Sequence, residues 1–459
     1  MFNIVEKIKN KFVKKNDEIP EYMQYHLLRS PGKKVRGGYD FTNEEHNLVC
    51  IETLNKLKEF NIKNKVKAGK KIDVAFLIDN IAKFTADSVY KEMEKSEIFN
   101  PFILFYDALD KTFIRQPKNF ESHKKDVELL KSRGYNVVDG YFSDGRFIPI
   151  DNFKIDIIFL NAPAMCYSNM FLSNVYLNTK YLVCYLNYSI NTINSYDYHY
   201  NNKRIASAWK HFVETREDYL EILDNSKFFG TNTVLVGYPK LDTYAKPIEE
   251  CVIPDKINNG KPIVIYAPHR SIKEKWEPLN ISTFHLYHKY FIDLLERYPE
   301  INFVYKPHPF IKTAIINKKV MTEDEYSEYI EKWNSAPNGL YVYDNEYINL
   351  FRHSDLLITD CGSFIGEWLP TDKPCMYLVN PERNQNTYML GFSTIGKKIL
   401  KHYYLCNNLE EIENNFKMIM LEKTDPFKNE RIKLKDEIFI NIGTAGKKIV
   451  EYLTEYISE

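Results

Sequence analysis

The feature that most constrains the fold is an alternation of short apolar runs with amphipathic stretches, which starts near residue 71 and continues almost to the end of the chain. The runs are apolar at consecutive positions, as in strands that are covered on both faces. Helical spacing between them indicates βαβ units, so the strands are expected to lie parallel. The first series has expected strands at 73–78, 102–106, 136–138, 155–160 and 182–186, with helices at 85–97 and 122–133. The segment 233–242 closes this half with a further expected short strand and a Gly-Tyr-Pro-Lys turn.

A second series follows a polar stretch, 243–260, which contains Pro247, Pro254 and an Asn-Asn-Gly turn and suits a linker. Its expected strands are 262–267, 302–305, 340–342, 356–359 and 374–378, and its expected helices are 284–297, 323–333, 347–353, 364–369 and 409–422. We therefore predict an α/β protein with two doubly wound, Rossmann-like domains that face a cleft. The predicted division is a helical N-terminal extension at 1–70, a first domain at 71–245 and a second at 246–459, which agrees with a length of 459 residues.

Composition and charge exclude several classes of protein. Lys and Arg total 62, as do Asp and Glu, so no positive excess indicates a nucleic-acid partner. The seven cysteines are spread along the chain without a Cys-x-x-Cys pair, which favours a reducing compartment and not a disulfide framework. No apolar run reaches the roughly 18–20 residues that cross a bilayer, and the N-terminus lacks the pattern of a secretory signal. We expect a cytoplasmic protein.

Residues 1–15 have the pattern of a basic amphipathic helix. Ile4, Ile8 and Phe12 fall on one helical stripe, and five lysines accompany a single glutamate. Such a helix can lie on an anionic membrane surface, or it can dock on the core of its own protein. Both interpretations remain open, and the first places the chain at the inner face of the cell membrane.

Polar residues gather at three strand ends of the second domain. The first strand runs into Pro268-His269-Arg270, the second into Lys306-Pro307-His308, and the strand at 356–359 into Asp360-Cys361-Gly362-Ser363 with Glu367 one helical turn later. In open α/β sheets ligands bind beyond the carboxyl ends of the strands. These residues are therefore the candidates for a binding and catalytic site.

The chemistry that these residue types suggest is the handling of a phosphorylated ligand. Gly362 and Ser363 lie where a strand becomes a helix, so backbone N–H groups and a hydroxyl can receive a phosphate. Arg270 and Lys306 can neutralise a diphosphate, and Glu367 can accept hydrogen bonds from sugar hydroxyls. Taken singly, each has a structural explanation: Ser363 as a helix cap, or Asp360 as a brace of its turn. Their presence at neighbouring strand ends favours the functional interpretation.

The sequence does not require a metal. His285 and His288 lie three residues apart on an expected helix, but no carboxylate at metal-binding spacing accompanies them. Side-chain cations can offset the charge of phosphates, so no cofactor is expected and Mg²⁺ is not indicated.

Four motifs in order, GYPKLD, APHRS, YKPHPF and SDLLITDCGSFIGEWLPTDKPCMYL, resemble those of the CDP-glycerol glycerophosphotransferase family of teichoic-acid and capsule enzymes. The resemblance runs from about residue 234 to 453. It implies a two-domain, glycosyltransferase-B-like fold that holds a CDP-alditol mainly in the second domain. It also implies transfer of glycerol-phosphate or a related alditol-phosphate to a glycan or lipid-linked acceptor in cell-surface polysaccharide synthesis, with release of CMP.

The resemblance implies a role for individual residues as well. His308 occupies the family's catalytic His-Pro position and is the expected base or charge stabiliser. Pro268-His269 lies at the family's nucleotide-contact turn, and His269 is the second catalytic candidate. Ser363 with Gly362 lies where the family holds the pyrophosphate, Glu367 where an acidic residue contacts the nucleotide. The basic position of the Gly-x-Pro-Lys segment is Lys240.

The chain departs from the family pattern in two places. The strand end near Asn187 lacks the histidine of the family's Trp-His-Gly motif, and His199, in a downstream loop, is a weak substitute. Cys361 replaces one of two usual hydroxyls before the helix. These departures indicate a divergent branch, with a different acceptor, a different transferred group, or His308 as the sole base. Two alternative functions remain open. One is a nucleotide-sugar glycosyltransferase on the same fold, and the other is a non-catalytic scaffold of the capsule machinery, which only the missing histidine supports.

Overall fold

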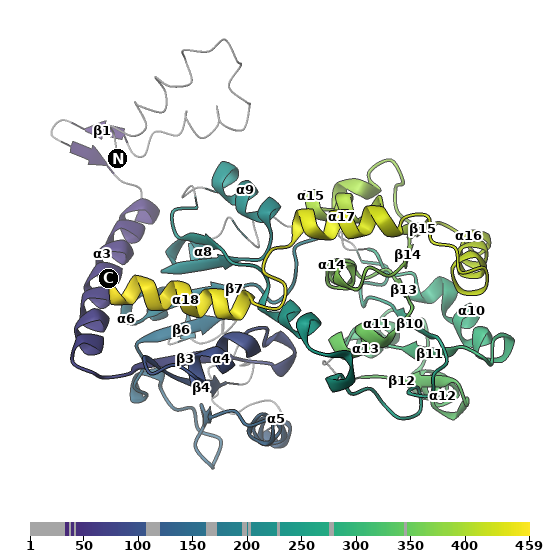
Figure 1. Cartoon of the computed structure of the whole chain (residues 1–459), viewed down its shortest axis with the longest axis horizontal. Coiled ribbons are helices and arrows are strands. Elements are labelled where there is room, and N and C mark those ends of the chain that lie inside the picture. Colours follow the sequence, from purple (N-terminus) through teal and green to yellow (C-terminus); the bar gives the residue numbers. More distant parts are fainter. Residues whose placement is uncertain are drawn as a thin grey trace, which may run out of the picture.

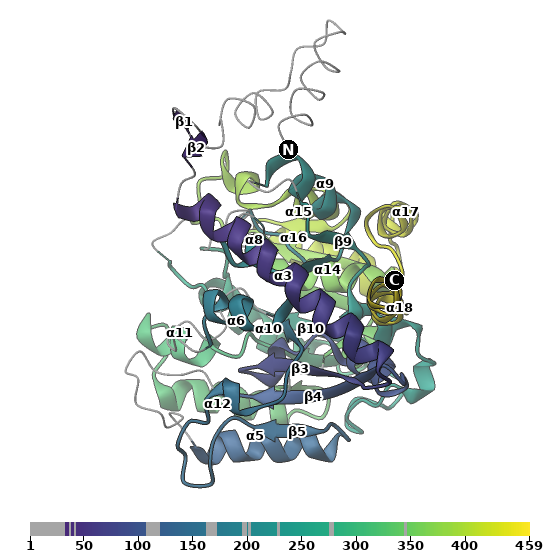
Figure 2. The ribbon, with the colours of Figure 1, turned by 90° about the vertical axis from the view of Figure 1, so that its left-hand side faces the viewer.

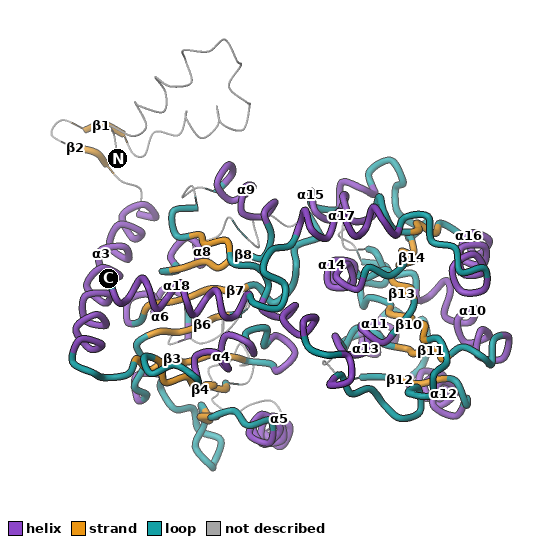
Figure 3. Tube along the Cα trace, viewed as in Figure 1, coloured by secondary structure: helices purple, strands orange, loops and turns teal. Residues whose placement is uncertain are grey.

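The computed structural model describes residues 33–35, 38–40, 43–106, 120–161, 172–194, 200, 203–226, 230–274, 280–343 and 347–459. Two parallel sheets lie side by side, each covered by helices on both faces (Figures 1 and 3). Within the described part of the chain, no helix combines the length and apolar content that a bilayer crossing needs. The doubly wound α/β architecture predicted from the apolar alternation is confirmed.

The first sheet has seven parallel strands in the order β5-β4-β3-β6-β7-β8-β9. Strand β3 lies inside the sheet, where it pairs with β4 on one side and β6 on the other, and its residues are almost all buried. Burial on both faces explains why its sequence is apolar at consecutive positions. The strands are β3 Ile72–Ile78, β4 Phe99–Phe105, β5 Val137–Asp139, β6 Ile157–Leu160, β7 Leu182–Leu186, β8 Lys210–Val213 and β9 Thr233–Leu235.

The second sheet has six parallel strands in the order β12-β11-β10-β13-β14-β15. Strand β10 lies between β11 and β13, so the three strand ends with the candidate residues are neighbours. The strands are β10 Ile263–Ala267, β11 Asn302–Tyr305, β12 Gly339–Tyr341, β13 Leu356–Thr359, β14 Cys375–Leu378 and β15 Tyr404–Cys406.

All the strands expected from the sequence are present, with ends that differ by up to three residues. Strands β8 and β15 were not expected. Strand β8 reads Lys-His-Phe-Val, so only two of its four residues are apolar and the sequence shows no apolar run. His211 is nevertheless fully buried. Strand β15 has only three residues, too few to show a period.

The helices expected in the second half are also present. They are α10 Phe284–Arg297, α12 Glu323–Ser335, α13 Ile348–His353, α14 Gly362–Trp368 and α16 Leu409–Phe416, the last followed by a π-helical turn, Lys417–Leu421. Helices α4 Asp87–Glu94 and α5 Phe120–Ser132 match the two expected in the first half.

The N-terminal extension contains the expected helical region. Helix α3, Asn43–Lys67, crosses the outer side of the first half (Figure 2). Lys58 Nζ donates to the carbonyls of Asn178 and Tyr181, which joins this helix to the first sheet's surroundings. Two short strands, β1 Lys33–Val35 and β2 Gly38–Asp40, form an antiparallel pair that was not expected. Residues 1–15 lie outside the described residues.

The last helix returns to the first half of the molecule. Helix α18, Ala445–Ser458, packs against α4 and α3, and the buried side chains of Ile449 and Leu453 belong to the core around β3 (Figure 1). The sequence division placed this helix with the rest of 246–459. The core of the first half therefore contains the end of the chain.

Candidate functional site

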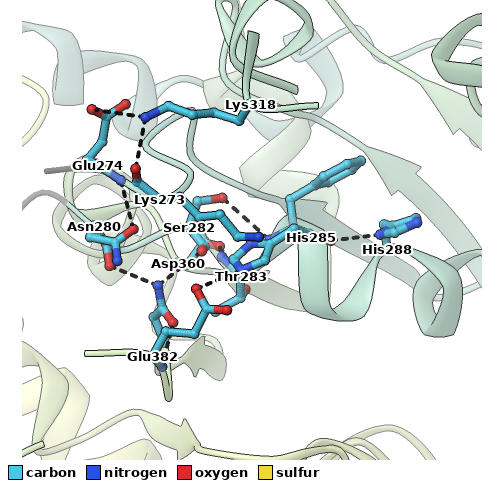
Figure 4. A network of polar contacts seen from close by, with 12 residues as sticks. Lys273, Glu274, Asn280, Ser282, Thr283, His285, His288, Lys318, Asp360 and Glu382 are labelled. Atoms are coloured by element: carbon cyan, nitrogen blue, oxygen red, sulfur yellow. Dashed lines mark hydrogen bonds and ion pairs between the residues drawn. The ribbon is translucent and has the colours of Figure 1, made fainter. Parts of the chain in front are cut away.

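The turn after β10 is held in place by the carboxylate of Asp360. Its Oδ1 accepts the backbone N–H of His269 at 2.5 Å. Its Oδ2 accepts the N–H and hydroxyl of Thr283 at 2.6 and 2.8 Å (Figure 4). Burial raises the pKa of Asp360 to about 7, against these hydrogen bonds. Asp360 thus braces the site and joins three segments, and its oxygens face protein donors.

Two histidines lie together at the ends of β10 and β11. The ring centroids of His269 and His308 are 4.9 Å apart, at an angle of 78°. The backbone N–H of His308 donates to the carbonyl of Pro268 at 3.0 Å, which fixes the second turn on the first. The structure therefore brings together the two residues predicted to be catalytic.

Hydrogen bonds set which nitrogen of each ring is available. Nδ1 of His308 accepts the N–H of Phe310 at 3.1 Å, and Nδ1 of His269 accepts the N–H of Ser271 at 3.3 Å. A neutral imidazole whose Nδ1 accepts carries its proton on Nε2. Both rings therefore offer an Nε2–H donor.

Burial and the nearby positive charges keep both histidine rings neutral. Burial lowers the pKa of His308 to about 4, and the nearby charges of Arg270 and Lys306 contribute to the shift. Burial, His308 and Arg270 hold the pKa of His269 well below its usual range. Lys306 is almost completely buried, 5.5 Å from the centre of the Tyr347 ring. Two imidazoles and two cations thus share one small region.

The turn after β13 leads into helix α14. Cys361 is its N-cap residue, so Ser363 lies inside the helix and the alternative explanation of Ser363 as the helix cap does not apply. The Ser363 hydroxyl contacts the Cys361 sulfur at 3.3 Å. Burial raises the pKa of this thiol to about 11, although hydrogen bonds from the Ser363 hydroxyl and the N–H groups of Phe364 and Ser363 oppose the shift. A thiol is a weak hydrogen-bond acceptor, so the Ser363 hydroxyl and the N–H groups of Ser363 and Phe364 can still donate to a stronger acceptor, such as a phosphate oxygen.

Glu367 and Lys240 form a buried ion pair across the two halves of the sequence. Lys240 Nζ lies 3.1 and 3.2 Å from the two carboxylate oxygens of Glu367, which is 1% exposed. The hydroxyls of Tyr238 and Tyr347 also donate to this carboxylate. Protein donors thus surround the carboxylate predicted to bind the nucleotide, and Lys240 is its counter-ion.

The first half contributes the end of β7 to this region. Asn187 stands where the resemblance expects a histidine, and its N–H and side-chain amide donate to Glu214 at 3.2 and 3.3 Å. Burial raises the pKa of Glu214 to about 7. Burial also raises the pKa of Tyr188, and the charge of Arg270 acts against the shift. His199 lies outside the described residues.

A polar network on the far side of Asp360 holds the start of α10 (Figure 4). His285 Nε2 lies 3.0 Å from Glu382, and His288 Nδ1 lies 3.0 Å from the carbonyl of Phe284. Lys318 donates to the carbonyl of Lys273 at 2.8 Å. Both histidines are thus used in local contacts, and among the described residues no group of three or more His, Cys, Asp or Glu could hold a metal ion.

Some residues of the site have no local pattern in the sequence. Tyr238 lies within the GYPKLD motif, which the resemblance singled out, but its bond to Glu367 joins residues 129 positions apart. Tyr347, Thr283 and Ser271 are ordinary polar residues of loops or helix starts. Only the fold shows that they fix the charged groups.

The comparison with protein families gives one match. Residues 175–436, more than half of the chain, match the family described as CDP-glycerol:poly(glycerophosphate) glycerophosphotransferase. The match covers the ends of β7, β10, β11 and β13. No curated protein matches the sequence.

Solved structures with the same fold include two of the wall teichoic acid polymerase TagF. One has 15% sequence identity and a TM-score of 0.53, and it covers 91% of this chain and 98% of that chain. The other has 14% identity and a TM-score of 0.52, and it covers 91% and 99%. Staphylococcus aureus MnaA with UDP has 15% identity and a TM-score of 0.50, over 84% and 97%. These likenesses confirm the predicted glycosyltransferase-B-like fold.

Proposed function

This chain belongs to the CDP-glycerol:poly(glycerophosphate) glycerophosphotransferase family, and from that premise we propose that it moves an alditol-phosphate group from a CDP-activated donor to a glycan or lipid-linked acceptor. Family membership makes the chain a transferase of cell-surface polymer synthesis, of the teichoic-acid type. In the proposed reaction the acceptor hydroxyl attacks the phosphorus that carries glycerol or a related alditol. The bond from this phosphorus to the CMP oxygen breaks, CMP leaves, and the hydroxyl loses its proton.

The observation that carries the proposal is the convergence of His269, Arg270, Lys306 and His308 at the carboxyl ends of two adjacent strands. A diphosphate brings negative charge that two cations offset, and two neutral Nε2–H groups donate to its oxygens. Ser363, at the start of α14 just beyond the neighbouring strand β13, binds the same group in this proposal. Positioning and charge stabilisation are most of what phosphoryl transfer requires.

We assign His308 the role of a hydrogen-bond donor to the phosphoryl group. To act as the general base, its Nε2 must be unprotonated, which places the ring proton on Nδ1. Nδ1 lies 3.1 Å from the backbone N of Phe310, whose N–H points at it. A protonated Nδ1 would place two N–H donors against each other, and neither could then accept a hydrogen bond. The Nε2–H form is therefore favoured, and the proton of the acceptor hydroxyl passes to the departing CMP phosphate and from there to water.

No cofactor is part of the proposed reaction, because Arg270 and Lys306 supply the positive charge that a metal supplies elsewhere. The ion pair between Lys240 and Glu367 joins the two halves of the chain beside the proposed donor site. In this scheme Lys240 acts on the donor through the position of Glu367.

The experiment that tests the function is a calorimetric titration with CMP, CDP-glycerol, UDP and GDP, with and without EDTA. We expect the cytidine compounds alone to bind, with or without EDTA, and Ser363→Ala and Arg270→Ala to weaken binding by about tenfold or more. Lys401→Ala is the control, because this exposed lysine lies away from the strand ends.

Other outcomes of the titration contradict the proposal in distinct ways. Binding of UDP or GDP instead indicates a nucleotide-sugar glycosyltransferase. Binding of no nucleotide indicates a scaffold protein. Loss of binding in EDTA shows that a metal, Mg²⁺ for example, is part of the donor site.

We also propose that residues 1–15 bind the anionic inner face of the cell membrane, where a lipid-linked acceptor is available. The apolar stripe of Ile4, Ile8 and Phe12 and the five lysines support this proposal. We expect the full chain to sediment with vesicles that contain anionic lipid and a chain lacking 1–15 to remain in the supernatant. Neutral vesicles are the control, and equal sedimentation of both chains with anionic vesicles contradicts the proposal.

A further inference from the structure

A five-residue segment of the first half, Ile190 to Asn194, crosses to the second half and is called the strap here. Ile193 forms an antiparallel bridge with Phe392. The N–H of Asn194 donates to the carbonyl of Gly391 at 2.9 Å, and the N–H of Ser393 donates to the carbonyl of Thr192 at 3.0 Å. Backbone hydrogen bonds thus tie the strap to the second half.

Three glycines of the second half make room for the strap. A Cβ on Gly362 would lie 2.5 Å from Ile193, one on Gly366 3.1 Å from Ile190, and one on Gly396 2.1 Å from the carbonyl oxygen of Thr192. These distances are shorter than van der Waals contact. The strap is therefore packed directly against the start of α14 and against α15, Thr394–Leu400.

Thr192 makes the contact closest to the donor site. Its hydroxyl donates to the carbonyl oxygen of Gly362 at 2.6 Å, and the side chain is 1% exposed. That carbonyl belongs to the same planar peptide unit as the N–H of Ser363, and in a trans peptide the two groups point in opposite directions. A hydrogen bond to the carbonyl therefore fixes the direction of the Ser363 N–H and polarises it toward its own acceptor.

We propose that Thr192 is a positioning residue, supplied by the acceptor-side half, which orients the peptide between Gly362 and Ser363 for the phosphate of the donor. The inference rests on the proposed function, because that function places the donor phosphates at Ser363. The Thr192 hydroxyl reaches the carbonyl of Gly362 because the strap packs against Gly362, Gly366 and Gly396. The geometry of the donor site thus depends on how the two halves are assembled.

The test compares Thr192→Val, which keeps the shape and removes the hydroxyl, with Thr192→Ser, which keeps the hydroxyl. We expect Thr192→Val to weaken CMP binding by roughly threefold to tenfold, and Thr192→Ser to bind like the wild type. Thr192→Ala, which only removes atoms, replaces the valine variant if that one does not fold.

Ser393→Ala is the matched control for a loosened strap. Ser393 Oγ donates to the carbonyl of Asn191 at 2.7 Å and accepts the N–H of Gly396 at 3.1 Å, but it does not contact Gly362. If Ser393→Ala weakens CMP binding as much as Thr192→Val does, Thr192 only anchors the strap and the proposal is overturned.

Amide hydrogen exchange of the unliganded protein gives a readout that is independent of the donor. We expect faster exchange of the Ser363 N–H in Thr192→Val and wild-type exchange in Thr192→Ser. Unchanged exchange in Thr192→Val overturns the proposal, whether or not CMP binds. Absence of CMP binding to the wild type, with the expected exchange, contradicts the proposed function and leaves the positioning of this peptide by Thr192 supported.

Discussion

At the scale of single residues, the site is defined by how its charged groups are neutralised. His269 and His308 are half-buried beside cations, and their lowered pKa values make both neutral donors. Asp360 is a brace whose oxygens face Thr283 and His269. The sequence predicted which residues gather at the strand ends, but not their ionisation or direction, because these depend on neighbours from other segments.

The role of His308 leads to a first prediction at this scale. Removal of one preorganised donor to a charged transition state typically lowers turnover by about 10²–10³. We expect His308→Ala to lower the turnover number of transfer from CDP-glycerol by this factor while circular dichroism stays that of the wild type. His402→Ala, in a turn away from the strand ends, is the control. Near-normal turnover in His308→Ala would place the donor elsewhere.

The lowered pKa of His308 also predicts how stability changes with pH. An unfolded histidine titrates near 6.5, whereas His308 in the folded protein titrates at about 4. Between these values the unfolded state binds more protons, so the contribution of His308 to stability is lost as the pH falls from 6.5 to 4.

Denaturant unfolding at pH 7 and pH 5 measures this effect. We expect the loss of stability between the two pH values to be smaller in His308→Gln than in the wild type. A variant with the full wild-type loss would show that other groups cause the acid sensitivity.

At the scale of elements, the ends of β10, β11 and β13 provide the site, and the strap fixes one of them from the other half. The parallel strands were predictable because consecutive apolar residues report burial on both faces. The strap was not predictable, since its five residues have no period and pack into spaces left by three glycines. A glycine in the sequence shows that a side chain is absent, but it does not show which other segment packs into the space.

Gly396→Ala tests the packing of the strap. The new Cβ would lie 2.1 Å from the carbonyl oxygen of Thr192, a backbone atom that cannot rotate away. We expect the free energy of unfolding to fall by about 1–3 kcal/mol, as for other overpacked sites. Denaturant titration measures the change, with Lys401→Ala as the control on an exposed side chain. Wild-type stability of Gly396→Ala would show that the strap moves freely.

At the scale of the whole molecule, helix α18 returns from the second half and packs on the first sheet. Helix α18 covers the core around β3, so the first half needs both the residues near position 72 and those near position 453. The Lys240–Glu367 pair and the strap join the same two halves near the donor site. The two sheets are thus connected by side-chain and backbone contacts as well as by the linker.

Leu453→Ala tests the contribution of α18 to the first half. Leu453 is fully buried in the core around β3, and truncation of such a leucine costs about 2–5 kcal/mol. We expect a loss of this size in the unfolding transition, together with faster hydrogen exchange in β3 and β4. Glu455→Ala, on the exposed side of the same helix, is the control. Faster exchange confined to α18 would contradict this packing.

The sequence by itself determined the long apolar strands, the parallel sheets and the polar residues at the strand ends, because these follow from local apolar periodicity and from the direction of parallel strands. It did not determine the short or half-polar strands β1, β2, β8 and β15. The tertiary structure alone decided the partners of those residues. Lys240 meets Glu367 across 127 positions, and Thr192 meets Gly362 across 170. Contacts between residues so far apart depend on how whole helices and strands pack together, and the local sequence around either residue does not determine that packing.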